Sequence, residues 1–349
     1  MMNSTRVWLF GVVAAALMCL SVQGRPEERE QVANPPRTIV VALDGSGEYR
    51  SIQEAVEAAG RGDTVRVKAG TYQEDVTIHS KEGLRLVGAG ADRVRVLGLN
   101  RVGAFHIGKW PYGATDIEIS GLAIQEHGGL AMGIFNGRRI VLRDLRIDGL
   151  LFGQQVQDVR IEHCIIGGSE TTGVQFADSH AVLVGNLIHH NDHGVTVAGK
   201  SDIRLERNII TQNLYEGVVV TDHARAILIN NTIVENGGGL AFLQHAQGEA
   251  TGNIVGLNKI GFLVGEASVP RLSYNAVGNR EHDYVKAGTP DRPAPELKTD
   301  TDVAVDPRFV DSSRGDFRLR PDSPLLQIGP FAYLGALPPL GAASPLSPR

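Results

Sequence analysis

Residues 186–264 of the chain, broken where the pattern recurs, read NLIHHNDHGVTVAGKSDIRLER (186–207), NIITQNLYEGVVVTDHARAILIN (208–230), NTIVENGGGLAFLQHAQGEATG (231–252) and NIVGLNKIGFLV (253–264). Each block begins with an asparagine, and these asparagines lie 22, 23 and 22 residues apart. A second asparagine recurs with the same steps, at Asn191, Asn213, Asn236 and Asn258. A glycine follows each of these, at Gly194, Gly217, Gly239 and Gly261. Such self-similarity predicts a solenoid in which each repeat covers the apolar face of the next.

The units of this solenoid are predicted to be β-strands. Apolar residues alternate with period two, as in Ile203-Arg204-Leu205, which is the period of a strand rather than of a helix. Repeats made of helix pairs need about 33 residues or more, so 22 residues are too few. The pattern predicts an all-β parallel β-helix with coils about 4.8 Å apart. We expect about nine coils over roughly residues 64–265, forming one domain.

The asparagine columns are predicted to be structural. An amide side chain both donates and accepts, so asparagines stacked at matching turns can bond to one another and to the backbone. The glycine column is expected where a turn enters a strand and the backbone needs space or a positive φ. Neither column is evidence for catalysis.

The N-terminal segment has the features of an export signal. Residues 1–24 carry Arg6, then a hydrophobic stretch from Val7 to Leu20 and small residues near Gly24, which is typical of a secretory signal peptide and too short for a membrane span. We therefore expect a protein that is secreted or periplasmic after cleavage, followed by a linker at residues 25–37. Cleavage would leave Cys164 as the only cysteine, so no disulfide within the chain is expected.

The solenoid domain is expected to span residues 38–330, with a cap at each end. Residues 51–59 (SIQEAVEAA) predict a helix with a Ser51–Glu54 capping box that ends at Gly60. This helix is expected to cover the open first coil, whose exposed core and strand edge would otherwise aggregate. A C-terminal capping segment completes the domain, and the Pro-rich residues 331–349 are expected to form a disordered tail.

Both ends of this domain resemble a known group. The opening Asp44-Gly45-Ser46-Gly47-Glu48-Tyr49 and Gly70-Thr71-Tyr72-Gln73-Glu74 is similar to that of the pectin-lyase-like right-handed parallel β-helix superfamily, including pectinesterases. The stretch Val305-Asp306-Pro307-Arg308-Phe309 resembles the closing segment of the same group. The resemblance covers roughly residues 38–329 and implies a right-handed parallel β-helix, often secreted.

The resemblance does not extend to the active sites of that superfamily. The pectinesterase motif Asp-Phe-Ile-Phe-Gly has its nearest counterpart in residues 173–178 (GVQFAD), which lack the nucleophilic aspartate, and Trp110-Pro111 has no preceding Gly-Arg. The Asn-Thr-Asp and Gly-His-Gly signatures of polygalacturonases and the Asp-Pro-His-Asp motif of alginate epimerases are absent from the sequence. No aspartate cluster like the calcium site of pectate lyases stands out, so no cofactor is expected, with calcium left open.

The turn after the second asparagine column is the first candidate site. Cleaving or epimerising a uronate needs a base for the C5 proton, an acid for the leaving oxygen and a cation for the carboxylate. His193, Tyr215 and Glu216 fall at matching positions of adjacent coils and are the predicted catalytic groups. The predicted substrate-binding neighbours are Glu170, His190 and, as the cation, Arg160. The alternative is that these polar turns are simply solvated.

A second candidate column lies six residues past each glycine and contains Lys200 and His223, which would form a weak anion or metal groove. An exposed turn is the alternative explanation. No spacing of His, Cys or carboxylates has the specificity of a structural metal site.

Two functions follow as hypotheses. The first is a polysaccharide lyase or C5-epimerase that acts on an acidic glycan; the second is a non-catalytic glycan-binding or scaffold β-helix. The net charge of −5 argues against nucleic acid as a partner, and a monomer without a membrane span is expected. The outward column Gln175, Thr196, Val219, Ala241 and Leu263 is fairly apolar, which predicts that residues 270–330 pack across it.

Overall fold

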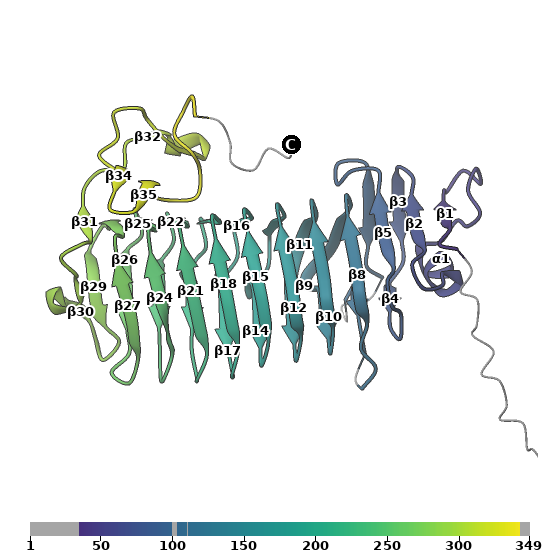
Figure 1. Cartoon of the computed structure of the whole chain (residues 1–349), viewed down its shortest axis with the longest axis horizontal. Coiled ribbons are helices and arrows are strands. Elements are labelled where there is room, and N and C mark those ends of the chain that lie inside the picture. Colours follow the sequence, from purple (N-terminus) through teal and green to yellow (C-terminus); the bar gives the residue numbers. More distant parts are fainter. Residues whose placement is uncertain (1–34, 100–102, 110, 343–349) are drawn as a thin grey trace, which may run out of the picture. The chain divides into compact units, whose positions relative to one another are not determined.

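The coils of a parallel β-helix make up most of the computed structural model, which describes residues 35–99, 103–109 and 111–342. The first of three sheets has eleven parallel strands, one from each coil, as Figure 1 shows. Its strands, in spatial order, are β1 (Thr38–Val41), β2 (Thr64–Val67), β5 (Arg85–Gly88), β8 (Thr115–Ser120), β10 (Arg138–Arg143), β12 (Gln157–Glu162), β15 (His180–Val184), β18 (Asp202–Glu206), β21 (Arg225–Ile229), β24 (Gln247–Thr251) and β27 (Val269–Ser273). The predicted fold class is confirmed, but there are about eleven coils rather than nine, because the coils of β1 and β27 lie outside the predicted range of residues 64–265.

The second sheet is built from short strands that follow the first sheet in each coil. Its members are β3 (Gly70–Gln73), β6 (Val94–Leu97), the first parts of β9 (Ala123–Phe135) and β11 (Arg146–Gln154), β13 (Ile165–Gly167), β16 (Leu187–His189), β19 (Ile209–Thr211), β22 (Thr232–Val234), β25 (Ile254–Gly256), β28 (Ala276–Gly278) and β31 (Val303–Ala304).

The third sheet completes each coil. It comprises β4 (Val76–Ile78), β7 (Phe105–Ile107), the second parts of β9 and β11, β14 (Thr172–Ala177), β17 (His193–Ala198), β20 (Glu216–Val220), β23 (Gly238–Phe242), β26 (Ile260–Val264) and β29 (His282–Lys286), with β30 (Thr289–Pro293) antiparallel to β29. Strands β9 and β11 each belong to both the second and the third sheet.

Apolar side chains that point inward from all three sheets form one continuous core. In the first sheet Ile117, Ile140 and Val159 lie in register on successive strands, as their alignment in the sequence predicts, and all three are buried. Stacking each coil on the next removes its apolar face from water, which is the main driving force for this fold.

The two asparagine columns form buried ladders of hydrogen bonds, as predicted. In the first ladder Asn208 Nδ2 donates to Asn231 Oδ1 at 3.0 Å, and the next asparagine repeats the contact. This ladder continues through Asn275 to Asp302, and the second continues through Asn279 to Asp283. Each therefore ends on an aspartate, which accepts the last hydrogen bond and has no N–H group that would need a further acceptor.

The predicted cap helix is α1 (Ile52–Ala58), which buries Ile52, Ala55 and Val56 against the first coil. Ser51 is its N-cap, but the accompanying carboxylate is Glu74 of the adjacent coil rather than Glu54. Glu74 accepts hydrogen bonds from the Ser51 hydroxyl and from the backbone N–H groups of the first helical turn at 2.7–2.9 Å. Free N–H groups at a helix N-terminus attract any well-placed carboxylate, whether local or distant.

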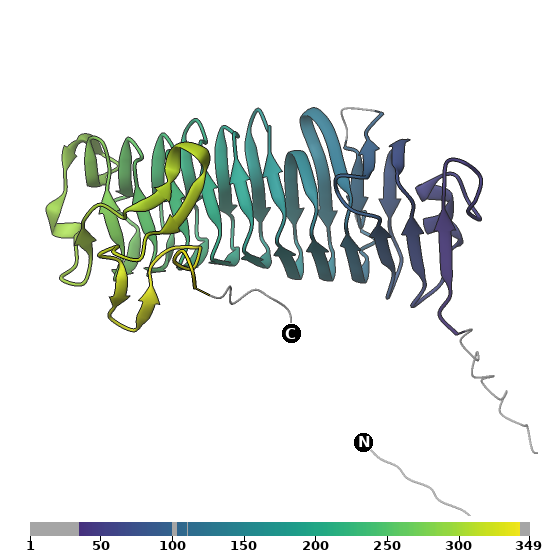
Figure 2. The same ribbon diagram turned by 90° about the horizontal axis from the view of Figure 1, so that it is seen from above.

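The C-terminal segment folds back onto the second sheet, as Figures 1 and 2 show. After the short helix η1 (Pro295–Leu297) it contains β32 (Phe309–Asp311), η2 (Ser312–Arg314), β33 (Asp316–Leu319), β34 (Leu326–Ile328) and β35 (Phe331–Tyr333). Its apolar residues share a cluster with Val234, Ile254 and Ala276 of the second sheet, and the Ala336 N–H donates to Thr232 Oγ1 at 2.9 Å.

Two predictions about this segment are therefore wrong. It does not pack across the Gln175 column, whose outward side chains belong to the third sheet. The reason is that the second sheet also presents apolar side chains outward near the C-terminal end, and these are the ones covered. The predicted tail begins too early, because β35 pairs with β34 and Leu334 is buried.

The predicted signal peptide, residues 1–24, lies outside the described residues, as does most of the linker. No helix in the described part of the chain is long and apolar enough to cross a membrane.

Candidate functional site

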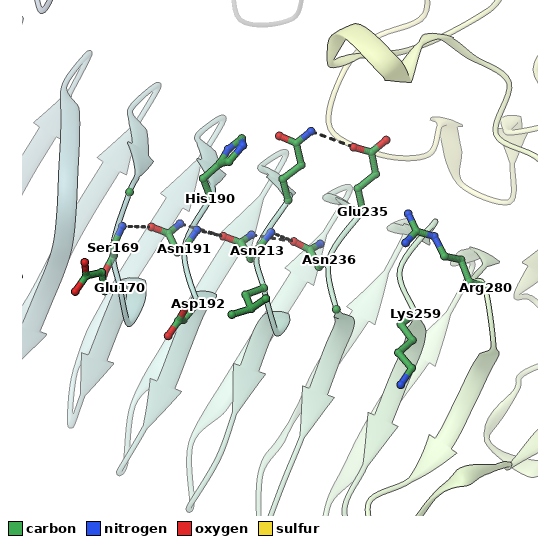
Figure 3. Close-up of a pocket in the computed structure, with 14 residues that line it drawn as sticks. Ser169, Glu170, His190, Asn191, Asp192, Asn213, Glu235, Asn236, Lys259 and Arg280 are labelled. Atoms are coloured by element: carbon green, nitrogen blue, oxygen red, sulfur yellow. Dashed lines mark hydrogen bonds between the residues drawn. The ribbon is translucent and has the colours of Figure 1, made fainter. Parts of the chain in front are cut away.

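A groove of about 620 Å³ runs along the turns that follow the second asparagine column. Figure 3 shows Asn191, Asn213 and Asn236 in line along its floor. Successive coils supply the side chains that line it, among them Glu170, His190, Asp192, Gln212, Leu214, Glu235, Lys259 and Arg280. Because the asparagine ladder fixes the backbone beneath, these side chains project from regularly spaced turns.

The three predicted catalytic residues lie together beside this groove. His193 and Tyr215 directly follow the groove residues Asp192 and Leu214 in the chain. His193 Nδ1 lies 3.2 Å from Glu216 Oε2, and the ring centroids of His193 and Tyr215 are 5.2 Å apart. The His193–Glu216 contact is not aligned as a hydrogen bond, and it is an ion pair only when His193 is protonated. Tyr215 is 52% exposed and therefore accessible to a ligand.

The coil that carries Tyr215 departs from the repeat. Glycine follows the second asparagine by three positions at Asn191→Gly194, Asn236→Gly239 and Asn258→Gly261, but by four positions at Asn213→Gly217. The additional residue falls in the run Leu214-Tyr215-Glu216, and Leu214 and Tyr215 are both exposed. An additional residue in one strand of a ladder redirects side chains, a device found frequently next to active sites.

The electrostatics of the cluster favour an ionised carboxylate next to an imidazole. Contact with the His193 imidazole holds the pKa of Glu216 below its usual value, despite the opposing effect of burial. On the neighbouring strand end, His189 and His190 face each other with their Nδ1 atoms 2.7 Å apart. Burial, with the His190 and Arg146 charges, lowers the pKa of His189, so His189 is a neutral ring near pH 7.

The cations of the groove are Lys259 and Arg280, which sequence reasoning missed. Each directly follows an asparagine of the second ladder, Asn258 and Asn279 respectively. Lys259 Nζ is 3.7 Å from a Glu281 carboxylate oxygen at the exposed surface, so that pairing is weak. Both would have been identified by comparing the residue that follows each asparagine of the second ladder in every coil, including the last ones.

Arg160 does not reach this site. It lies on β12 in the first sheet, where it pairs with Glu162. Two arginines on the preceding coil are also paired: Arg139 with Asp116 and Arg143 with Glu162. The prediction that Arg160 neutralises the substrate carboxylate is therefore wrong, because strand alternation fixes only whether a side chain points outward, not on which of three sheets it lies.

Lys200 and His223 also lie away from the groove. They follow the far ends of β17 and β20, whereas His193 and Glu216 begin those strands. A six-residue strand such as β17 spans about 20 Å. The His223 ring stacks face to face on the His245 ring, with centroids 5.0 Å apart. The backbone N–H of Lys200 donates a hydrogen bond to Asp178 Oδ1. Glu170 and His190, in contrast, do line the groove as predicted.

The described residues contain no group of three or more His, Cys, Asp or Glu side chains arranged to hold a metal ion. The chemistry that the groove itself offers is acid–base and electrostatic: an imidazole held by a carboxylate, an exposed phenol, and two cations at the other end. An imidazole and a phenol can transfer protons, and cations further along the groove can bind anionic groups.

Comparison with known families gives two partial matches. Residues 140–291 match the family of NosD, described as a periplasmic copper-binding protein, and residues 38–121 match the pectinesterase family. Among curated relatives, pectinesterase 2 of Citrus sinensis is 40% identical over 84 residues, 23% of this chain and 16% of that protein. The probable pectinesterase/pectinesterase inhibitor 17 of Arabidopsis thaliana is 33% identical over 217 residues, 54% of this chain and 40% of that protein. The matches thus span less than half of the relatives' own length.

Solved structures resemble the fold at low identity. The pectate lyase Pel9A superposes with a TM-score of 0.56 at 13% identity, covering 88% of this chain and 97% of that one. The A-module of mannuronan C-5 epimerase AlgE4 from Azotobacter vinelandii gives a TM-score of 0.51 at 15% identity, covering 69% and 88%. The structural similarities show the fold. Together with the two family matches over residues 38–121 and 140–291, the coil architecture supports assignment to the pectin-lyase-like parallel β-helix superfamily.

Proposed function

We propose that the protein is a polysaccharide lyase or C5-epimerase that acts on a uronate glycan in the groove beside His193, Tyr215 and Glu216. One observation carries the proposal: His193 lies 3.2 Å from a carboxylate and against a phenol ring, next to a groove that contains two cations. The pectate lyase and the epimerase among the structural relatives act on glycans of this class by name. Their low identity to this chain makes them support for the proposal only.

In this mechanism His193 is the base. Its Nδ1 faces Glu216, which leaves Nε2 for the substrate, and the ionised Glu216 stabilises the imidazolium that forms. His193 Nε2 takes the proton from C5 of the uronate. Lys259 and Arg280 lie three and four coils, about 14 and 19 Å, along the groove, where they bind carboxylates of neighbouring uronate units.

Tyr215 is the acid. In a lyase the C4–O bond breaks as the C4=C5 double bond forms, and the Tyr215 hydroxyl protonates the leaving oxygen. In an epimerase the C4–O bond stays intact, and a solvent proton returns to C5 from the opposite face, because the Tyr215 ring lies on the same side of the substrate as His193. Both reactions begin with the same proton abstraction.

The protein is proposed to work outside the cytoplasm as a monomer, in line with the hydrophobic N-terminal sequence and the periplasmic description of the NosD family. A polysaccharide is the proposed partner, because an open groove along stacked coils accommodates an extended chain.

A panel of uronate polymers tests the proposal. Purified protein is incubated with polygalacturonate, polymannuronate, polyguluronate and glucuronate-containing glycans. Absorbance then reports unsaturated products, and proton NMR reports epimerised units. We expect one polymer to give one of these products. Binding without either product on every polymer supports the alternative, a non-catalytic glycan-binding protein, and overturns the proposed chemistry.

A further inference from the structure

Three rings form an aromatic surface on the third sheet, towards the N-terminal end from the His193 cluster. They are His106 on β7, Phe135 on β9 and Phe152 on β11, from three successive coils. The ring centroids of His106 and Phe135 are 6.2 Å apart, and those of Phe135 and Phe152 are 6.0 Å apart. Both phenylalanines are partly exposed and lie outside the buried core.

A glycine makes room for the central ring. A Cβ added to Gly133 would lie 2.6 Å from the Phe135 ring and 3.1 Å from the His106 ring. Gly133 pairs in register with Phe152 on one side and His106 on the other. Only the missing side chain at this position lets the Phe135 ring lie over the strand between its two neighbours.

The hollow next to this surface is uncharged. It has a volume of about 270 Å³ and is lined by Phe135, Asn136, Gln154 and Gln155. The amide side chains donate and accept hydrogen bonds but carry no charge. An aromatic face with amides at its rim suits the apolar face and hydroxyl edge of a pyranose ring, and provides nothing to neutralise a carboxylate.

We propose that Phe135 and Phe152 form a binding subsite for an uncharged sugar unit of the glycan that reaches the His193 site. This inference rests on the proposed function, and it adds that the glycan carries a neutral or esterified unit at a fixed distance from the reacting uronate. Phe152, Gln175 and Thr196 pair in register, so the coil of Phe152 lies two coils, about 10 Å along the axis, from that of His193. One extended glycan chain can therefore contact both places.

Calorimetric titration tests the subsite without requiring turnover. The probes are hexasaccharides of galacturonate, mannuronate and guluronate, each as the free acid and as the methyl ester. For the hexasaccharide that binds, we expect Phe135→Ala and Phe152→Ala each to weaken binding about three- to tenfold, from the lost stacking. The ester should bind at this subsite at least as well as the acid. The weakening of binding in the two alanine variants should not change with salt concentration.

Three further variants separate the rings from the fold. Phe152→Leu keeps an apolar side chain without a ring and should weaken binding like Phe152→Ala, whereas Phe152→Trp should retain it. Gly133→Ala should displace the Phe135 ring and also weaken binding. His180→Ala, an exposed histidine on β15 of the first sheet, should bind as the unchanged protein does.

The outcomes distinguish this inference from the proposed function. Unchanged binding in Phe152→Leu overturns the subsite even if His193→Ala abolishes turnover. Weakened binding without turnover on any polymer keeps the subsite and overturns the chemistry. If no hexasaccharide binds, or if the Phe152 variants instead dissociate a dimer in light scattering, the surface is not a glycan subsite.

Discussion

At the scale of single residues, Asn231 shows how much one side chain of a ladder does. It is 0% exposed; its Nδ2 donates to Asn253 Oδ1 and to the Leu205 carbonyl, and its Oδ1 accepts from the N–H and the Nδ2 of Asn208. No water reaches these groups, so each needs a partner from the protein.

Replacing Asn231 with Leu should therefore destabilise the protein. The groups of Asn208 and Leu205 would lose their partners, and each buried group left unpaired costs roughly 1–3 kcal/mol. Urea unfolding followed by circular dichroism measures the change. Gln247→Leu, an exposed amide on β24, is the matched control and should change the free energy of unfolding by less than about 0.5 kcal/mol. Equal effects in the two variants would contradict the ladder.

Glu216 links the site to pH. Because its pKa is lowered in the folded protein, the ionised form is favoured by folding. This contribution to stability is fully present above the ordinary pKa of about 4.3 and is lost as the pH falls through the lowered value. The unfolding free energy of the unchanged protein should therefore exceed that of Glu216→Gln by more at pH 6 than at pH 3. A difference in unfolding free energy that is the same at both pH values would show that the His193–Glu216 contact contributes no charge interaction.

The groove shows which site residues a sequence can reveal. His193, Tyr215 and Glu216 were predictable as neighbours because residues at matching positions of adjacent coils must lie about 5 Å apart. Their contact still depends on the residue inserted before Gly217, which no repeat pattern explains. Lys259 and Arg280 were missed because they lie three and four coils away from His193, beyond the adjacent coils in which neighbours were sought.

At the scale of elements, strand period and repeat position determine which residues share a coil, but not which of the sheets the C-terminal segment covers. The outward apolar positions of the second and third sheets look alike in the sequence. The C-terminal segment covers Val234, Ile254 and Ala276 on the second sheet. It leaves Gln175, Thr196 and Val219 of the third sheet partly exposed. Such a choice depends on the path of the chain after β31, which contains no repeat.

The C-terminal segment should behave as a separately unfolding unit. Leu325 is 0% exposed within its cluster, and truncating a buried leucine to alanine costs about 2–5 kcal/mol. Leu325→Ala should therefore accelerate hydrogen exchange of amides in residues 306–336, while the amides of the asparagine ladders keep their protection. Leu340→Ala, at an exposed leucine of the same segment, is the control. Equal loss of protection in the ladders would mean that the segment and the coils unfold together.

At the scale of the whole molecule, the repeat made the solenoid predictable, while its limits were not. The coil of β1 carries no asparagine at the ladder positions, and the coil of β27 lies beyond residue 265, where the predicted range ended, so the predicted coil count was too low. The cap helix was found from local signals, Ser51 and the apolar spacing after it, because helix ends are encoded locally. The distant Glu74 that completes its N-terminus could not be found in that way.

The most direct test of the central claim is whether the protein removes the C5 proton of the uronate polymer that it processes. An epimerase replaces this proton with deuterium from the solvent, whereas a lyase leaves no hydrogen at C5 and is tested with a C5-deuterated polymer. The account predicts C5 deuterium in epimerised product, or a C5 kinetic isotope effect on elimination. It also predicts at least a 100-fold loss of turnover in His193→Ala, with His180→Ala unchanged and both variants folded as β-rich protein. Turnover in His193→Ala equal to that of His180→Ala would contradict the assignment of the site.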